Sequence, residues 1–202
     1  MHEPLTRDLE MASAPSPEEA SEVLERHRYL IERTFPPGAL DGLDAAGKAT
    51  VHANNAELGV RWIRSYANAE KTKTWCVYEA PSEQAVREAA ARNGIPVDSI
   101  VEVPGDLDPG PLPEMAAPAH RYLVERTFPA GALDGLDAAA KEQVNAHNAG
   151  FGVRWVTSYA NADLTKTWCI YEGPSVEAVI AAAAANGIPA DVVTEVPVDL
   201  LP

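Results

Sequence analysis

An internal duplication constrains this sequence more than any other feature. Residues 27–107 align with residues 120–200 without a gap, and more than two thirds of the aligned positions carry the same residue. The unit is longer than the roughly 20–50 residues of solenoid repeats, so each copy has the length of a small domain. We predict a leader over 1–26, a first repeat over 27–104, a linker over 105–119 and a second repeat over 120–202.

The two segments outside the repeats have patterns of their own. The segment 105–119 reads "GDLDPGPLPEMAAPA", and its proline and glycine content is typical of a linker. In the leader, Ser16 followed by Pro17 and Glu19 has the pattern of a capping box, which predicts a short helix. The leader has no apolar run long enough for a signal peptide, and no stretch of the sequence approaches a membrane span.

Within each copy the residue pattern predicts the element order β-α-β-β-α-β. In the first copy, runs of β-branched and aromatic residues predict strands, and Asp44 and Ser82 are the expected N-caps of two helices. The expected strands cover 27–35, 60–67, 72–79 and 99–104, and the expected helices end near residues 58 and 92. This order is that of the ferredoxin-like fold, an antiparallel four-stranded sheet with two helices on one face. The predicted fold class is therefore α+β, with two tandem ferredoxin-like βαββαβ domains.

Alternation along the expected strands divides their side chains between two faces. One face is apolar, and we expect it to meet the helices. The other face mixes apolar residues with polar and charged ones, which suits neither water nor a dry core. The apolar face holds Ile31, Phe35, Trp62, Trp75, Val77, Val101 and Val103, and the mixed face holds Leu30, Glu32, Arg61, Ile63, Ser65, Thr74, Cys76, Tyr78 and Glu102.

A half-polar sheet face suits packing against a second sheet around a lumen, and the second copy supplies that sheet. We therefore expect the two sheets to face each other as a pseudo-dimer within one chain. On this arrangement the two cysteines, Cys76 and Cys169, are buried without a disulfide and point into the space between the halves. They are accompanied there by carboxylates and tyrosines, namely Glu32, Glu102 and Tyr78 with their counterparts Glu125, Glu195 and Tyr171.

Each of these residues also has an ordinary structural explanation. A free cysteine usually behaves as a small buried hydrophobic residue. Glu32 or Glu102 can pair with Arg61 across neighbouring strands, and Arg154 can neutralise the carboxylates of the second copy in the same way. A functional site is favoured by the convergence of these groups on one face, and the hypothesis depends on the assignment of faces.

Histidines are the main difference between the copies. His52 lies on the first expected helix where the second copy has Asn145, and His147 lies on the equivalent helix where the first copy has Asn54. A single histidine on the apolar stripe of a helix usually has a structural role, so both are secondary candidates for metal ligands. The sequence contains no zinc-protease, paired-cysteine, phosphate-loop or nucleophile-elbow motif, and we assign no catalytic residue.

The net charge of −14 limits the partners of the protein. Such a chain repels the phosphate backbone of nucleic acids and anionic membrane surfaces. Its acidity suits cations and a soluble protein, and two cysteines without close spacing do not indicate a disulfide framework. We expect a cytoplasmic protein without a nucleic-acid or membrane partner.

Four segments of the second copy, with their counterparts in the first, resemble a known bacterial family. They are "RYLVERTFP", "GVRWVTSYA", "TKTWCIYEGPSVEAV" and "NGIPADVVTEVP". The family is a ferredoxin-like, or α/β plait, domain-of-unknown-function family that includes an actinobacterial nickel-binding protein. The resemblance covers both copies and implies the α/β plait fold, often dimerised through its sheets.

The resemblance also implies nickel binding, for which this chain offers ligands. Ni²⁺ accepts imidazole, carboxylate and thiolate. The candidate ligands are Glu32, Cys76, Glu102, Glu125, Cys169, Glu195, His52 and His147, with the strand-leading His27 and His120 as further candidates. The first function we expect is a soluble metal-binding protein, with nickel as the metal, that acts in sequestration or sensing.

Two other functions remain open from the sequence. One is a small-molecule-binding protein or cofactorless enzyme that uses a lumen between the sheets, where Arg61, Tyr78, Arg154 and Tyr171 would hold the ligand. The other is a structural or regulatory module whose lumen is filled. In each case we expect a compact monomer whose halves form an intramolecular pseudo-dimer.

Overall fold

The predicted element order is present in both copies. The computed structural model describes residues 26–111 and 119–201, and the helix expected in the leader lies outside them. The first half contains β1 (His27–Thr34), α2 (Ala45–Ala56), β2 (Arg61–Ala67), β3 (Lys73–Ala80), α3 (Glu83–Arg92), β4 (Ser99–Glu102) and β5 (Gly105–Leu107). The second half contains β6 (His120–Thr127), α4 (Ala138–Gly150), β7 (Arg154–Ala160), β8 (Lys166–Gly173), α5 (Val176–Ala185), β9 (Val192–Glu195) and β10 (Val198–Leu200). Each βαββαβ unit is thus followed by one additional short strand.

Polar caps begin the helices at the predicted residues. The Asp44 side chain accepts a hydrogen bond from Gly47 N at 2.8 Å, and the Ser82 hydroxyl accepts one from Ala85 N at 3.2 Å. Such caps satisfy backbone N–H groups that have no partner within the helix. After α2 the chain turns into β2 at Gly59, whose φ of +66° is a left-handed conformation that favours glycine. Local sequence therefore sets where these elements begin and end.

Each sheet has five antiparallel strands, and its fifth strand comes from the other half of the chain. The strand orders are β10-β2-β3-β1-β4 and β5-β7-β8-β6-β9. β5 follows the first unit but pairs with β7, and β10 follows the second unit but pairs with β2. Residues 105–107, which we expected to belong to a linker, therefore form a strand that ties the two halves together.

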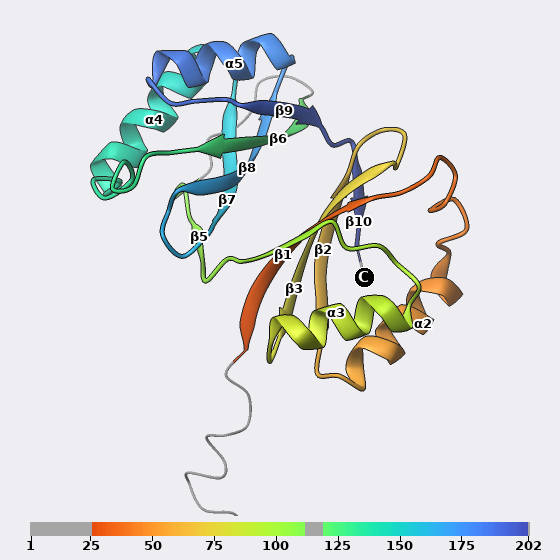
Figure 1. Cartoon of the computed structure of the whole chain (residues 1–202). Helices are drawn as coiled ribbons and strands as arrows, with labels where there is room; N and C mark the ends of the chain where they lie inside the picture. The colour runs from red at the N-terminus through yellow and green to blue at the C-terminus, as the bar shows by residue number, and fades with distance from the viewer. Residues whose placement is uncertain (1–25, 112–118, 202) are drawn as a thin grey trace, which may run out of the picture.

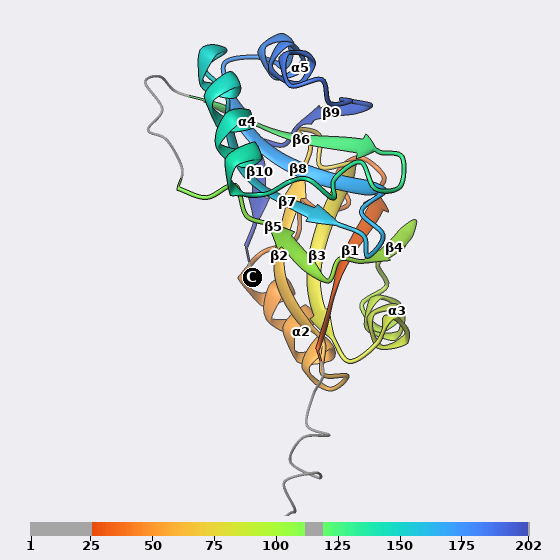
Figure 2. The same cartoon turned by 90° about the vertical axis from the view of Figure 1, so that its left-hand side faces the viewer.

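The two sheets face each other, and the helices lie outside them, as Figure 1 and Figure 2 show. α2 and α3 lie on the outer side of the first sheet, and α4 and α5 on the outer side of the second. The facing sheets expected of a pseudo-dimer are confirmed, but the expected lumen is filled by an apolar core. Equivalent residues of both halves build this core, namely Leu30, Tyr66, Trp75, Val77 and Val103 with Leu123, Tyr159, Trp168, Ile170 and Val196.

The predicted assignment of the strand faces is correct for β1 but wrong for β3 and β4. Trp75 points into the core between the sheets, whereas Cys76 lies in the core beneath the helices, and the second half repeats this arrangement. The cause is the register, which places Ile31 opposite Cys76 and Glu32 opposite Trp75. Alternation shows which residues of one strand share a face, but a shift of one residue between neighbouring strands exchanges the faces. Because both faces of these strands are apolar, the sequence pattern did not fix that shift.

A β-bulge in β2 adds to the difference. The pairing with β3 shifts after Trp62, and Ser65 then lies opposite Cys76. A bulge inserts one extra residue and changes the direction of the side chains that follow. Trp62 and Ser65 therefore both point towards the helices, where Trp62 Nε1 donates to Ser65 Oγ at 2.9 Å. β7 has a bulge at the equivalent position.

Candidate functional site

The predicted metal cluster of the first half is not assembled. Glu32 shares its face with Trp75 and points between the sheets, whereas Cys76 points towards the helices. Glu102 lies opposite Tyr29, which belongs to the helix-side core. The second half separates its counterparts in the same way: Glu125, Cys169 and Glu195. Within the described residues, no group of three or more His, Cys, Asp or Glu side chains could hold a metal ion.

Glu32 and Glu125 meet two lysines where the sheets face each other. Lys73 Nζ lies 3.5 Å from each carboxylate, and Lys166 Nζ lies 3.6 Å from each. Trp168 Nε1 also donates to Glu32 Oε1 at 3.1 Å. The glutamate side chains are 14% and 12% exposed, so salt screens these pairs less than pairs at the surface. The carboxylates are neutralised, as the structural explanation expected, but by lysines and not by arginines.

Arg61, expected to hold a ligand, pairs with a carboxylate of the neighbouring strand. Arg61 Nη2 lies 2.5 Å from Glu79 Oε2, and Arg28 Nη2 lies 3.5 Å from the same carboxyl group. Burial by itself raises the pKa of Glu79, but Arg61 and Arg28 outweigh it and hold the pKa below its usual range. Arg28 Nη1 also reaches Asp106 of β5 at 2.7 Å and so links the first sheet to a strand of the second.

Arg154 has the equivalent position in the second half. Its Nε donates to Glu172 Oε2 at 3.1 Å, and Arg121 Nη2 lies 3.2 Å from Glu172 Oε1. Burial again raises the pKa of Glu172, and the two arginines outweigh it and lower the pKa. Arg121 also pairs with Asp199 of β10, which repeats the link between sheets seen in the first half. The structure therefore gives Arg61 and Arg154 structural partners.

Each half carries one exposed histidine–glutamate pair at equivalent positions. His27 Nδ1 lies 2.7 Å from Glu102 Oε1, and His120 Nδ1 lies 2.7 Å from Glu195 Oε1. The histidine begins the first strand of its half, and the glutamate ends the adjacent edge strand, β4 or β9. The side chains are 37% and 46% exposed in the first pair and 60% and 44% in the second. Imidazole and carboxylate are thus both within reach of an ion from solvent.

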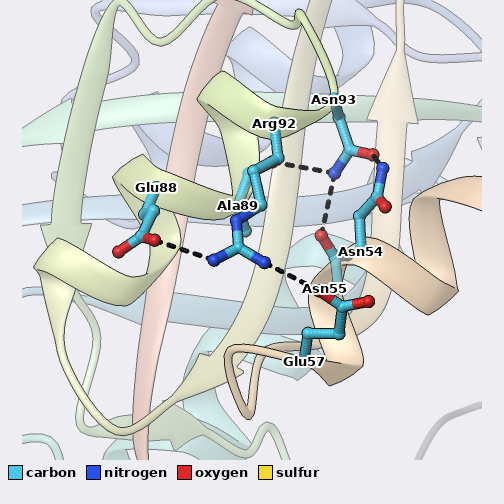
Figure 3. Close-up of polar contacts among 7 residues, drawn as sticks. All are labelled: Asn54, Asn55, Glu57, Glu88, Ala89, Arg92 and Asn93. Carbon is cyan, nitrogen blue, oxygen red and sulfur yellow. Dashed lines mark hydrogen bonds and ion pairs between the residues drawn. The ribbon is translucent and has the colours of Figure 1, made fainter.

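His147 belongs to a polar contact between helices. In the first half, Asn54 Nδ2 donates to Asn93 Oδ1 at 2.8 Å, and Asn93 Nδ2 donates to Asn55 Oδ1 at 3.0 Å, as Figure 3 shows. In the second half His147 takes the place of Asn54, and its Nδ1 lies 2.9 Å from Asn186 Oδ1. The histidine therefore replaces an amide in a contact that holds two helices together.

His52 also contacts the protein interior. Its ring stacks on Trp62 with the ring centroids 5.6 Å apart. Trp62 in turn lies beside Tyr78, with ring centroids 6.5 Å apart. The position of His52 is thus explained by packing on the aromatic residues beneath α2.

Cys76 lines a small cavity between the first sheet and its helices. The cavity has a volume of about 60 Å³. The Cys76 thiol donates to Thr74 Oγ1 at 3.3 Å, and the guanidinium of Arg33 lies over the Tyr78 ring, 5.6 Å from its centroid. Burial raises the pKa of Tyr78, Cys76 acts in the same direction and Arg33 opposes them. A cation, a phenol, a thiol and an alcohol thus border a cavity whose lining is mostly apolar.

The second half contains an equivalent cavity of about 50 Å³. Cys169 Sγ lies 3.2 Å from Thr167 Oγ1, and the guanidinium of Arg126 lies 5.2 Å from the centroid of the Tyr171 ring. Burial raises the pKa of Tyr171 to about 12, although Arg126 opposes the rise. Both copies therefore build the same four-residue arrangement at the same place in the fold.

Arg33 and Arg126 are the residues that sequence analysis missed. Arg33 shares its strand face with Tyr29 and Ile31, and all three are buried. A charged residue within an apolar alternation was the available signal, because a buried charge requires an explanation. Tyr78 and Tyr171 were chosen as ligand-binding residues, and the structure places them in these cavities and not between the sheets.

A more open hollow lies elsewhere. It has a volume of about 860 Å³ and runs along α4 and residues 108–111. Asp137, which caps α4, and Asn145, whose amide donates to Pro109 O at 2.9 Å, line it. These groups already serve the helix start and the contact with the connecting segment, so we assign this hollow no role.

Comparison with known proteins identifies a family model that matches both halves of the chain. A family model described as "Nickel responsive protein SCO4226-like" matches residues 29–103 and 122–196. No curated protein matches the chain. Among solved structures, SCO4226 from Streptomyces coelicolor A3(2) is 21% identical, with 39% of this chain and 96% of that chain covered and a TM-score of 0.30. A variant of chlorite dismutase from Candidatus Nitrospira defluvii is 9% identical, with 88% and 91% covered and a TM-score of 0.45.

The family match covers most of the chain, and its two ranges occupy equivalent positions of the repeat. The similarity to solved structures is low in identity and in TM-score, so it carries no argument about what this chain does. The sequence match is sufficient for the assignment. The chain belongs to the SCO4226-like family of nickel responsive proteins, and it carries two tandem copies of the family's domain.

Proposed function

We propose that the chain binds a divalent metal ion at the pairs His27–Glu102 and His120–Glu195, and that this ion is nickel. The binding would serve sequestration or sensing of the ion. The observation that carries this proposal is the 2.7 Å contact between imidazole Nδ1 and carboxylate Oε1, which recurs in both halves. Membership of a nickel responsive family supports the choice of metal.

The donor chemistry of the pairs fits nickel. Ni²⁺ accepts imidazole nitrogen and carboxylate oxygen. Histidines that bind a metal commonly have their other ring nitrogen held by a carboxylate, which orients the ring. With Nδ1 of His27 held by Glu102, Nε2 is the nitrogen that can face an ion. The exposure of both side chains leaves room for water molecules to complete the coordination.

The charges around the first pair also permit a cation. A hollow of about 200 Å³ beside His27 and Glu102 is also lined by Arg26, Arg28 and Glu79, and Arg26 Nη1 donates to Gly59 O at 3.2 Å. Arg28 is paired with Glu79 and with Asp106, so its positive charge is compensated. The net charge of −14 attracts cations to the protein as a whole.

The other predicted ligands receive less support. Glu32 and Glu125 are each bound by two lysines, and Cys76 and Cys169 lie in the cavities beneath the helices. An ion at either place would have to displace a lysine or enter a buried cavity that holds an arginine. We therefore leave these residues out of the proposed site.

Calorimetric titration of the metal-free protein with Ni²⁺ tests the proposal. We expect two ions per chain, one ion in His27→Gln or His120→Gln, and none in the double variant. The affinity should fall as the pH is lowered, because protons compete with the metal for the imidazole nitrogen. His147→Gln is the matched control and should leave both sites intact.

Two results would redirect the assignment. If both histidine variants bind nickel as the wild type does, the two pairs are not the site. If Glu32→Gln or Cys76→Ser weakens binding instead, the ligands are those predicted from the strand pattern, and the local structure must rearrange around the ion.

A second candidate function, small-molecule binding, is favoured by the small cavity that recurs beneath the helices of each half. The space between the sheets is filled, so we propose these cavities as the place of a small ligand.

The cytoplasmic location and the monomeric state stay predictions. Across residues 26–111 and 119–201, the helices are too short or too polar to cross a membrane.

A further inference from the structure

The outer side of the helical layer differs between the two halves of the molecule. In the first half, charged residues on this side form three ion pairs. Arg87 Nη2 lies 2.6 Å from Glu83 Oε1 within α3. Arg92 Nη2 lies 2.9 Å from Glu88 Oε1, and Arg92 Nη1 lies 2.8 Å from Glu57 Oε2 at the end of α2, as Figure 3 shows. The outer side of α3 is therefore charged along its whole length.

The second half carries no charge at any of these positions. The counterparts of Glu57, Glu83, Arg87, Glu88 and Arg92 in the repeat are Gly150, Val176, Ile180, Ala181 and Ala185. Ile180, which stands where the first half has Arg87, is 46% exposed. The three ion pairs of the first half are thus replaced by an uncharged surface that remains open to solvent.

The helix α5 is apolar on both of its sides as a result. Its inner side buries Val179, Ala182 and Ala183, and α3 buries a valine and two alanines at the equivalent positions. Glu177 is the only charged residue in the sequence of α5. A surface helix normally has a polar outer side, whereas a helix that is apolar all round is buried. Figure 1 and Figure 2 show α5 at the outer end of the second half, away from the first sheet.

The exposed apolar residues lie together on one surface, which we call the α5 face. Val176, Ile180 and Ala184 are four residues apart, so they follow one side of the helix. Alanine side chains are short, which lets a second helix approach to about 8 Å between axes, the lower end of the usual range. The α5 face consists of Gly150, Val176, Ile180, Ala181, Ala184 and Ala185.

Charge indicates which molecule suits this face. The chain has a net charge of −14, so two copies repel each other over most of their surface. Like charges brought together at an interface are unfavourable, so copies can meet only where charged residues are missing. An interface with a different protein commonly uses opposite charges to select its partner, and the α5 face offers none for that purpose. The face therefore fits a second copy of the same chain.

We propose that two copies of the chain associate through the α5 face, related by a two-fold axis. In such a contact both copies contribute the same surface, so Ile180 of each copy packs against α5 of the other. α5 has 10 residues and is therefore about 15 Å long. A contact of this length is smaller than the standard interface of about 800 Å² per partner, so the dimer is weak.

The compact monomer expected from the sequence is then the state at low protein concentration, and the dimer forms as the concentration rises. The inference does not depend on the nickel sites or on the cavities beneath the helices.

Sedimentation equilibrium of the full chain tests the proposal. The average mass should rise from that of one chain at micromolar concentration towards that of two chains at millimolar concentration. A chelator is added throughout, because a metal ion held by exposed histidines could also join two chains. Sodium chloride should strengthen the association, since salt screens the repulsion between two acidic chains. An association through opposite charges would weaken instead, and this result would contradict the proposal.

Two matched variants locate the contact. Ile180→Arg restores the residue type of the first half and, in a two-fold contact, places a charge on both sides. We expect it to weaken association about a hundredfold. Val192→Arg makes the same change in charge at an equally exposed residue, 47% exposed, on the edge strand β9. Val192 lies opposite Glu125, on the side of the sheet away from the helices, so this variant should associate at least as well as the wild type.

Urea unfolding checks that both variants are folded. Three further results would overturn the proposal. The first is the mass of a single chain at every concentration. The second is an Ile180→Arg variant that associates as the wild type does, or a Val192→Arg variant that is weakened equally, because the contact would then lie outside the α5 face. The third is a mass above that of two chains, since a two-fold contact closes on itself.

Discussion

The first helix of each half, α2 in one and α4 in the other, makes different contacts with the rest of the protein. In the first half, His52 stacks on Trp62 with ring centroids 5.6 Å apart. In the second half, Asn145 stands at the equivalent position and donates to Pro109 O at 2.9 Å. The same helix carries Asn54 in one half and His147 in the other, and both bind the asparagine that follows the second helix.

These differences lie in the helical layer, and the strands also differ at some positions, such as Arg64 and Thr157. Both halves retain the buried arginine, the cysteine, the tyrosine of the cavity and the exposed histidine–glutamate pair. A helix surface accommodates an exchange of histidine and asparagine because either side chain can find a polar partner there. Buried sheet positions tolerate less exchange, because their side chains pack closely against their neighbours.

The core between the sheets contains a second difference. Trp168 Nε1 donates to Glu32, whereas Trp75 Nε1 is buried without a partner in the described part of the molecule. Both indole rings are fully buried, and a lysine lies over each ring, Lys73 over Trp75 and Lys166 over Trp168. The two tryptophans therefore share their packing and differ in one hydrogen bond.

The largest effects should come from these tryptophans. Trp75→Ala and Trp168→Ala should each lower the free energy of unfolding by about 3–5 kcal/mol, because each leaves a cavity in the shared core. Trp168→Phe should cost about 1 kcal/mol more than Trp75→Phe, since only Trp168 donates to a carboxylate. Equilibrium unfolding in urea measures all four variants. Equal losses in the two phenylalanine variants would show that the hydrogen bond to Glu32 adds no stability.

An intermediate effect should come from the paired carboxylates at the sheet edges. The pKa values of Glu79 and Glu172 are lowered in the folded protein by their arginines, so each contributes stability above the unfolded pKa of about 4.3. This contribution is lost as the pH falls through the lower folded value. The urea midpoint should therefore decrease on acidification below about pH 4.3.

The variants Glu79→Gln and Glu172→Gln compare the two halves. Each should make the urea midpoint less dependent on pH in the acidic range, and Glu172→Gln should do so more. The reason is exposure, because the side chain of Arg61 is 63% exposed and that of Arg154 is 24% exposed. Exposed pairs are weakened by solvent. A greater change in Glu79→Gln would contradict this ranking.

The smallest effect should come from exchanging the helix residues between the halves. Asn54→His and His147→Asn place in each half the residue of the other, and each should change the free energy of unfolding by less than about 0.5 kcal/mol. The number of nickel ions bound should not change either. Urea unfolding and the nickel titration check both points. Loss of an ion in His147→Asn would make this histidine a ligand and not a helix contact.

The fold could be predicted because its signals are local. The repeat, the order of elements and the caps at Asp44 and Ser82 depend on residues close together in the sequence, and the structure shows all of them. The burial of two unpaired cysteines was also predicted correctly. The strand ends were less certain, and the last strand of each unit is shorter than expected.

The candidate site could be predicted only in part, because it depends on register. A one-residue shift between β1 and β3 decides whether Cys76 lies opposite Glu32 or Ile31. In either register both faces of the sheet carry apolar residues, so the pattern does not select one of them. The pattern therefore selected Tyr78 and Cys76 correctly as neighbours but placed them on the wrong side of the sheet. It also paired Glu32 with an arginine, although its lysine partners come from both halves.

The sequence by itself determined that this chain contains two βαββαβ units, where their helices begin, and that the units are similar enough to pack as a pair. Those properties follow from local hydrogen bonding and from the alternation of apolar residues along each strand. Only the tertiary structure decided which face of each sheet meets its partner, that β5 and β10 are exchanged between the halves, and that Arg33 and Arg126 line small cavities beneath the helices. The physical reason is that these features depend on the register between strands and on contacts between residues far apart in the chain, which no local pattern encodes.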